Sequence, residues 1–207
     1  MCCCELVVCA KSCRSMLEAD RCGWRRPTVK IETPRIRLRC WQGGDREAFA
    51  AMNADPEVMR DLGGPISREE SDSKLDRFAA AFHRYGLGRL VVESPEGHFL
   101  GYASIMPSPP QHPLGSHFEI GWRLVRSAWG HGYATEAAEA ALHDAVARSG
   151  LTEILSYTAS DNIRSQAVMV RLGLRRCPSL DFTADYEKVG SWRDHPERSE
   201  RSHCRMT

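Results

Sequence analysis

Two glycines separated by a single residue stand where a strand-like segment gives way to an alanine-rich one. The whole run reads Leu124-Val125-Arg126-Ser127-Ala128-Trp129-Gly130-His131-Gly132-Tyr133-Ala134-Thr135-Glu136. Unpaired backbone N–H groups at the start of a helix, together with the positive end of its dipole, attract anions. Glycine also lets the backbone approach a phosphate closely, because it has no Cβ. The loop from Trp129 to Ala134 is therefore predicted to hold a pyrophosphate, and a tight turn without a ligand is the alternative.

Two common nucleotide-binding loops do not match this run. A P-loop ends in Gly-Lys-Ser/Thr, whereas Tyr133-Ala134-Thr135 stands here. The dinucleotide motif needs a third glycine where this chain has Thr135, and the preceding strands look antiparallel rather than like the opening of a βαβ unit. The spacing alone thus leaves open whether the turn binds a ligand.

A second informative run follows the next strand-like segment. It reads Asn162-Ile163-Arg164-Ser165-Gln166-Ala167-Val168-Met169-Val170-Arg171-Leu172-Gly173. With both runs in this order, the chain resembles the Gcn5-related N-acetyltransferases, which use acetyl-coenzyme A, and in particular the enzymes that acetylate N-terminal residues of ribosomal proteins. Their Trp-Gly-x-Gly-Tyr-Ala-Thr-Glu-Ala pattern is met at every fixed position from Trp129 onward. The resemblance covers roughly Thr28 to Phe182.

The resemblance implies a set of residues that bind the co-substrate acetyl-coenzyme A. Backbone N–H groups of the glycine loop would hold the pyrophosphate, and the end of the preceding strand would pair with the pantetheine arm as an added strand does. Arg126 would contact phosphate, unless it is a solvated surface arginine, and Asn162 would touch the cofactor besides capping its helix. The implied set is Leu124, Val125, Arg126, Trp129, Gly130, His131, Gly132, Tyr133, Ala134 and Asn162.

The reaction implied by the resemblance is direct transfer of an acetyl group from a thioester to an amine. The amine must lose a proton, the oxyanion needs donors, and the departing thiolate benefits from a proton. Glu119 is the candidate base, with His117 as a second choice and a salt-bridged surface glutamate as the alternative. Ser165 would face the thiol, and Tyr157 is either another proton donor or a buried structural tyrosine.

The acceptor is predicted to be a primary amine, in the first place a protein or peptide N-terminus. A small-molecule acetyltransferase acting on an antibiotic or a polyamine is one alternative, and a non-catalytic sensor of acyl-coenzyme A on the same fold is another. An acidic cleft would favour a polycation, whereas a narrow, hydrogen-bonding cleft would favour a peptide. A homodimer is left open. No metal is predicted, because the histidines His83, His98, His112, His117 and His131 lack ligand spacing.

The composition excludes several other classes of protein. The 207 residues carry 28 Lys plus Arg against 27 Asp plus Glu, so the net charge of +1 offers no field to attract nucleic acid or an anionic membrane. No apolar run approaches the roughly 20 residues that cross a bilayer. Six of the nine cysteines lie within the first 22 residues, which does not suit a disulfide-built secreted domain and favours a cytoplasmic location.

The order of expected elements predicts an α+β (mixed α/β) fold, a single acyl-CoA N-acyltransferase-like domain with a central, mostly antiparallel sheet flanked by helices. Extended segments are expected at 31–41, 89–93, 98–106, 117–125, 153–159 and 174–182. Helices are expected after an N-cap at Asp45, after a capping box at Ser67 and Glu70, from about Ala134 to Gly150, and at 162–172.

The two ends of the chain are expected to lie outside the domain of residues 28–182. Residues 1–27 form a cysteine-rich leader, predicted to be poorly ordered, with a zinc pair at Cys9 and Cys13 or cysteine acylation as alternatives. Residues 183–207 form a polar tail. The resembled family closes its sheet with a last hairpin, for which Val189, Trp192 and the region Cys204–Met206 are weak candidates.

Overall fold

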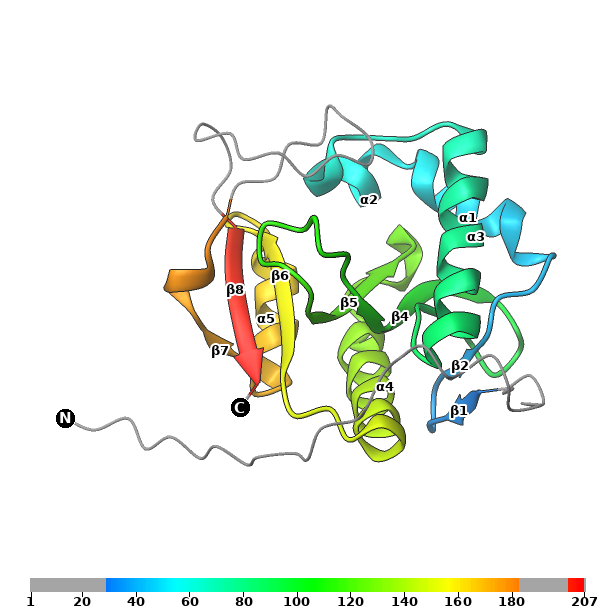
Figure 1. Cartoon of the computed structure of the whole chain (residues 1–207). Coiled ribbons are helices and arrows are strands. Elements are labelled where there is room, and N and C mark those ends of the chain that lie inside the picture. The colour runs from blue at the N-terminus through cyan, green and yellow to red at the C-terminus, as the bar shows by residue number, and fades with distance from the viewer. Residues whose placement is uncertain (1–28, 183–200, 207) are drawn as a thin grey trace.

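The computed structural model describes residues 29–182 and the backbone strand 201–206, and these residues form one sheet with helices on both faces (Figure 1). The helices are α1 (Asp45–Ala54), α2 (Pro56–Met59), α3 (Arg68–Tyr85), α4 (Tyr133–Ser149) and α5 (Ile163–Arg171), with short 3-10 helices η2 (Arg60–Leu62), η3 (Arg126–Ala128) and η4 (Pro178–Leu180). The strands are β1 (Lys30–Glu32), β2 (Arg37–Arg39), β3 (Leu90–Glu93), β4 (Phe99–Pro107), β5 (Phe118–Leu124), β6 (Ile154–Ala159), β7 (Arg175–Arg176) and β8 (Arg201–Met206).

The sheet has the order β1-β2-β3-β4-β5-β6-β8-β7 within the described residues. Neighbouring strands are antiparallel except at the centre, where β5 and β6 run parallel. The expected mostly antiparallel α+β architecture is therefore confirmed.

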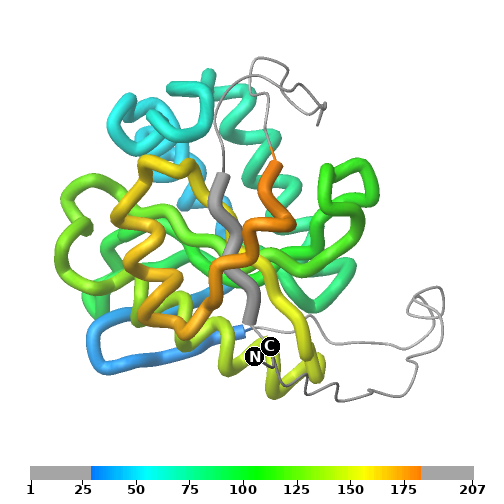
Figure 2. Tube along the Cα trace, turned by 90° about the vertical axis from the view of Figure 1, so that its left-hand side faces the viewer, coloured from blue at the N-terminus to red at the C-terminus, as the bar shows by residue number. Residues whose placement is uncertain are grey.

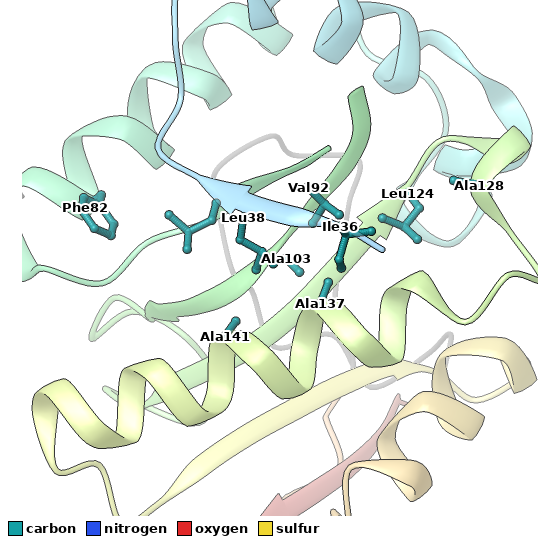
Figure 3. Packing of buried hydrophobic residues seen from close by; sticks show 10 residues of the cluster. Ile36, Leu38, Phe82, Val92, Ala103, Leu124, Ala128, Ala137 and Ala141 are labelled. Atoms are coloured by element: carbon teal, nitrogen blue, oxygen red, sulfur yellow. The ribbon is translucent and has the colours of Figure 1, made fainter. Parts of the chain in front are cut away.

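Helices cover the two faces with different side chains. Ala137 and Ala141 of α4 point at Ile36, Leu38 and Leu124 on one face, where small alanines let the helix lie close to the sheet (Figure 3). The opposite face packs against α1 and α3 through a cluster made of Phe49, Met52, Val58, Leu75, Phe78 and Tyr102. The view from the side shows α1 to α3 above the sheet and α4 below it (Figure 2).

The N-terminal part of the domain differs from the expectation in two places. Residues 31–41 do not form one extended segment but a hairpin of β1 and β2, whose turn contains Pro34 and is closed by the Thr33 N–H donating to the Ile36 carbonyl at 3.0 Å. The N-cap of α1 is Gly44 rather than Asp45. The Asp45 carboxylate is instead engaged by the Arg39 guanidinium and by the Gln42 N–H, so it cannot cap the helix.

Most other elements begin and end close to the predicted residues. The capping box of Ser67 and Glu70 starts α3, and Gly150 ends α4 in a left-handed conformation. The expected strand 174–182 is wrong, since only Arg175–Arg176 is extended before Pro178 opens η4. The last strand does exist as β8, and it includes the candidate region Cys204–Met206. The leader, Val189 and Trp192 lie outside the described residues.

Candidate active site

The two parallel strands at the centre of the sheet separate after a single point of contact. In the described structure their register consists of one pair, Glu119 opposite Leu155, and the rest of β5 has no ladder partner on β6. Beyond this pair β5 leads to the N-terminus of α4, and β6 leads to that of α5. The free edge of β5 is therefore available to pair with an extended ligand.

The backbone groups on that edge belong to Trp122 and Leu124 rather than to Val125, and of these the Leu124 carbonyl already accepts from the Trp129 indole N–H. The Val125 N–H donates to the Leu100 carbonyl at 3.0 Å, and the Val125 carbonyl accepts from the Ala128 N–H at 3.0 Å. Because successive residues of a strand turn their backbone groups to opposite edges, Leu124 and Trp122 face β6. The expectation that the Val125 backbone pairs with an added strand is thus revised to Trp122 and Leu124.

The glycine loop exposes a row of backbone donors at the start of α4. Gly130 and Gly132 have φ angles of +79° and +80°, which a residue with a Cβ adopts only under strain. Gly132 is the N-cap of this 17-residue helix and provides no side-chain cap. Among the described residues, no acceptor takes up the N–H groups of Gly130 to Ala134. The loop has the free donors and the helix dipole that an anion site needs.

Trp129 ties the loop to both neighbouring elements. Its indole N–H donates to the Leu124 carbonyl at 2.9 Å, which fixes the loop against the end of β5. The Arg164 guanidinium of α5 lies over the indole ring, 4.1 Å from its centroid. This cation–π contact joins the starts of α4 and α5, the two elements that flank the separated strands. The expected phosphate ligand Arg126 is exposed on η3.

A clamp from the N-terminal hairpin holds the same loop and was missed by sequence reasoning. Arg35 donates to the His131 carbonyl at 2.9 Å and to the Glu136 carboxylate at 2.7 Å, and Thr33 donates to the other Glu136 oxygen at 2.6 Å. Burial raises the pKa of Glu136, but the hydrogen bonds from Thr33 and Arg35 outweigh it, so the net pKa lies below its usual value. The partners lie about a hundred residues apart, and no local pattern connects them.

The side chain of Asn162 is occupied by two protein partners. Its Oδ1 accepts from the Ser165 N–H at 3.0 Å, which is the predicted N-cap of α5, and its Nδ2 donates to the Asp61 carboxylate of η2 at 2.5 Å. Ser165 is half-buried on the first turn of α5, with its backbone rather than its hydroxyl making the cap. The Asp61 contact joins the helices above the sheet to the start of α5.

Glu119 is paired with a buried arginine. Arg89 Nη2 lies 2.7 Å from Glu119 Oε2, with the Arg89 side chain 7% exposed and that of Glu119 21% exposed. Arg89 also donates to the backbone carbonyls of Ser104, Glu119 and Gly121. A Cβ at Gly121 would stand 2.7 Å from the guanidinium, so this glycine makes room for it. Arg89 was not singled out in the sequence because its role depends on the sheet register.

Tyr157 lies near Glu119, and its ring packs edge to face with that of His117 at a centroid distance of 5.9 Å. Burial and the charge of Glu119 raise the pKa of Tyr157 well above its usual value, so its hydroxyl stays protonated at neutral pH. His117 Nδ1 lies 2.9 Å from the Gly115 carbonyl, and it must carry the proton to donate there. The buried Nε2 of neutral His117 then bears a lone pair and has no hydrogen-bond partner in the described structure. Tyr157 thus lies close to Glu119 with His117 beside it, and the roles expected for these three residues stay predictions.

The described residues also bear on metal binding and on membrane insertion. They contain no group of three or more His, Cys, Asp or Glu side chains placed to hold a metal ion. Their helices include none that is both long and apolar enough to cross a membrane.

Comparison with known proteins assigns the fold to a family. Residues 35–175 match the family described as "Acetyltransferase (GNAT) domain". The FsC-acetyl coenzyme A-N(2)-transacetylase of Aspergillus fumigatus is 30% identical over 153 residues, which is 70% of this chain and 64% of that protein. This chain spans about two thirds of the length of the first curated relatives that it matches, 66% and 64%.

Solved structures agree with this family. An acetyltransferase from Agrobacterium tumefaciens superposes with a TM-score of 0.72 at 26% identity, covering 90% of this chain and 99% of the other. RimL, a ribosomal alpha-N-protein acetyltransferase bound to coenzyme A, shares the fold with a TM-score of 0.66 at 14% identity, covering 86% and 97% of the two chains. Together with the matched residues on both sides of the separated strands, these similarities show that the chain belongs to the GNAT acetyltransferase family.

Proposed function

We propose that this protein transfers an acetyl group from acetyl-coenzyme A to a primary amine, with a protein or peptide N-terminus as the acceptor. The observation that carries the proposal is the row of free backbone donors at Gly130–Ala134, which lies next to the unpaired edge of β5. The donors suit the pyrophosphate, and the edge at Trp122 and Leu124 suits the amides of the pantetheine arm. Coenzyme A offers both groups in one molecule.

The side chains beside Glu119 support the chemical steps of this proposal. The amine nitrogen attacks the thioester carbonyl, the carbon–sulfur bond breaks, and the thiolate leaves. Glu119, held by Arg89, takes the proton that the amine loses, and His117 Nε2 is the second candidate for that role. The thiolate takes a proton from the hydroxyl of Ser165 or from that of Tyr157, which stays protonated, and the proton that Glu119 received from the amine returns through solvent to that hydroxyl.

A small-molecule amine is the second candidate acceptor. The relative from Aspergillus fumigatus supports it, because its name assigns it an acetyl-coenzyme A-dependent reaction on a compound called FsC. A screen that offers acetyl-coenzyme A with peptides, polyamines and aminoglycosides, and detects the released thiol, separates the two classes. Tight binding of acetyl-coenzyme A without transfer to any acceptor would favour the non-catalytic sensor.

The glycine loop provides the sharpest test of cofactor binding. In Gly132→Val the added side chain occupies the space in front of the backbone donors of Gly130–Ala134. We therefore expect coenzyme A to bind about 100-fold more weakly or not at all. Gly150→Val is the matched control, because Gly150 also has a positive φ, of +63°, and lies at the other end of α4 with no atom near its Cβ position. Calorimetry on both variants, with melting temperatures measured in parallel, distinguishes loss of the site from loss of the fold. Unchanged affinity in Gly132→Val would contradict the assignment of this loop.

A further inference from the structure

Arg123 presents a positive charge on the face of β5 that also carries Glu119. Residues at even spacing along a strand share a face, so Glu119, Gly121 and Arg123 all turn toward α3. Arg123 lies over the Tyr102 ring, 5.8 Å from its centroid, and its Nη1 contacts Met59 Sδ at 3.0 Å. No carboxylate of the described residues forms an ion pair with it. The guanidinium is half-buried, and its contacts are an aromatic ring and a thioether.

Lys74 adds a second cation to the same place. It lies on α3, is half-buried, and forms no hydrogen bond or ion pair with any described residue. Burial lowers the pKa of its amine well below the usual value, and the charges of Arg123, Arg77 and Arg89 lower it further. Lys74 lies one turn before Phe78 on α3, and the Phe78 ring is 5.2 Å from the Tyr102 ring that Arg123 covers, which places Lys74 on the same side of the sheet as Arg123.

Several other arginines of the N-terminal half, unlike Lys74 and Arg123, form ion pairs with carboxylates. Arg39 is paired with Asp45 and Glu93, Arg46 with Asp72 and Asp76, and Arg68 with Glu47 and Asp72. Arg89 is paired with Glu119. Lys74 and Arg123, both half-buried, have no carboxylate partner among the described residues, and neither has the exposed Arg77 of α3. Two half-buried like charges without a counter-charge are costly, and an anion that binds between them recovers that cost.

We propose that Lys74 and Arg123 bind a carboxylate of the acceptor, so that the preferred substrate is an amine whose own molecule carries a carboxylate. This inference rests on the proposed acetyl transfer and specifies its acceptor. The four residue steps from Glu119 to Arg123 span about 13 Å along the strand, and the long side chains can reach toward each other across part of that distance. An amine beside Glu119 therefore places the second or third residue of an extended peptide near the two cations. A polyamine brings positive charge to the same place and is disfavoured.

Three matched peptides test this charge preference. They are identical except at the second and third residues, which are both Asp, both Asn or both Lys, and spermidine is added as the polyamine. With acetyl-coenzyme A and thiol detection, we expect kcat/KM for the Asp peptide to exceed that for the Asn peptide about tenfold, with the Lys peptide and spermidine lower still. Raising the salt concentration should reduce the difference, because the attraction is electrostatic.

Two variants of α3 test whether Lys74 causes the preference for the Asp peptide. In Lys74→Met the advantage of the Asp peptide over the Asn peptide should shrink severalfold, through a higher KM for the Asp peptide. Arg84→Gln is the matched control, since it removes one positive charge from the exposed last turn of the same helix and should keep the full preference. Coenzyme A affinity, measured by calorimetry, should stay the same in Lys74→Met because the site serves the acceptor. A loss of that affinity would overturn the inference by placing the two cations on the cofactor side.

The remaining outcomes separate this inference from the function on which it rests. Equal use of the Asp and Asn peptides, better use of the Lys peptide or spermidine, or a preference that survives Lys74→Met would each overturn it while supporting acetyl transfer. Coenzyme A binding without acetylation of any member of the panel would also overturn it. Failure of the wild-type protein to bind coenzyme A would instead contradict the proposed function itself.

Discussion

The cofactor side of the candidate site presents backbone groups, whereas the acceptor side presents charged side chains. The cofactor side consists of N–H groups from Gly130–Ala134 and the free edge of β5. The acceptor side combines Arg89 before β3, Glu119 and Arg123 on β5, and Lys74 on α3. The first is built mostly from one continuous loop, and the second exists only when three elements come together.

On the proposed function, this difference separates recognition by backbone position from recognition by side-chain charge. A pyrophosphate is recognised by donors whose position depends on glycine conformations, and few side chains are involved. Acceptor choice depends on charges that can be replaced one at a time without altering the fold. The acceptor side is therefore where this chain can differ in specificity from relatives that share its cofactor loop.

The largest effect expected in the chemical step comes from Glu119→Gln. The amide keeps an oxygen for Arg89 but cannot take up the proton, so kcat should fall by about 10²- to 10⁴-fold with little change in coenzyme A affinity. Single-turnover kinetics with a verified acceptor, together with calorimetry, measure the two quantities. A kcat close to that of the wild type would show that the charged acceptor side does not perform the proton transfer as proposed.

Two further variants show whether a loss of kcat in Glu119→Gln is specific to Glu119. Glu93→Gln is the control, because Glu93 is likewise a buried carboxylate paired with an arginine, Arg39, at 2.7 Å, but on β3 away from the separated strands. Its kcat should be near that of the wild type. If His117→Gln loses activity while Glu119→Gln keeps it, the proton acceptor is the Nε2 of His117.

The same contrast explains what the sequence could predict. The strand, the two glycines and the helix that follows are neighbours in the chain, so the pyrophosphate loop was predicted from spacing and from the family resemblance. The N-cap at Asn162 was predictable for the same reason, since its partner is only three residues away. Strand alternation is a local rule, so the sequence also predicted that Glu119 lies on the face opposite Ile120, while its role as the base stays a prediction.

What the sequence did not predict depends on contacts between distant segments. Arg89 reaches Glu119 only in this sheet register, and the Asp61 contact of Asn162 and the Arg35 clamp each cross about a hundred residues. The engagement of the Val125 N–H by the Leu100 carbonyl follows from the close approach of β4 at Gly101, whose φ is +139° and where a Cβ would meet the Arg123 carbonyl at 2.1 Å. None of these has a signature in the residue types alone.

A smaller effect is expected from Ser165→Ala, which tests whether a side chain contributes on the cofactor side. Because the backbone N–H of Ser165 makes the helix cap, the variant should keep the fold and coenzyme A affinity. Loss of the hydroxyl removes a donor that matters only as charge develops on sulfur, so kcat should fall about tenfold while KM for acetyl-coenzyme A stays the same. A wild-type kcat would assign the proton on sulfur to Tyr157 or solvent, and a further loss in Ser165→Ala combined with Tyr157→Phe would distinguish these two.

The smallest expected effect tests whether the position of the Gly130–Ala134 loop depends on its contacts with the distant β1–β2 hairpin. The lowered pKa of Glu136 means that its carboxylate binds Thr33 and Arg35 in the folded protein in preference to a proton. A carboxyl group with a lowered pKa contributes stability that is present above its unfolded pKa and is lost as the pH falls through the folded value. Glu136→Gln should therefore lower the free energy of unfolding by about 1 kcal/mol at neutral pH, a modest figure because Arg35 is exposed. The difference from the wild type should vanish in acid.

Denaturant unfolding of the wild type and Glu136→Gln between neutral and acid pH measures this difference, with Glu139→Gln as the control. Glu139 lies one turn further along α4, is exposed and forms no ion pair among the described residues, so its replacement should leave the pH dependence unchanged. Because Arg35 also donates to the His131 carbonyl inside the loop, Glu136→Gln should weaken coenzyme A binding a few-fold as well. If stability and affinity are both unaffected, the β1–β2 hairpin does not hold the loop, and the donors of Gly130–Ala134 are positioned by the glycines and α4 alone.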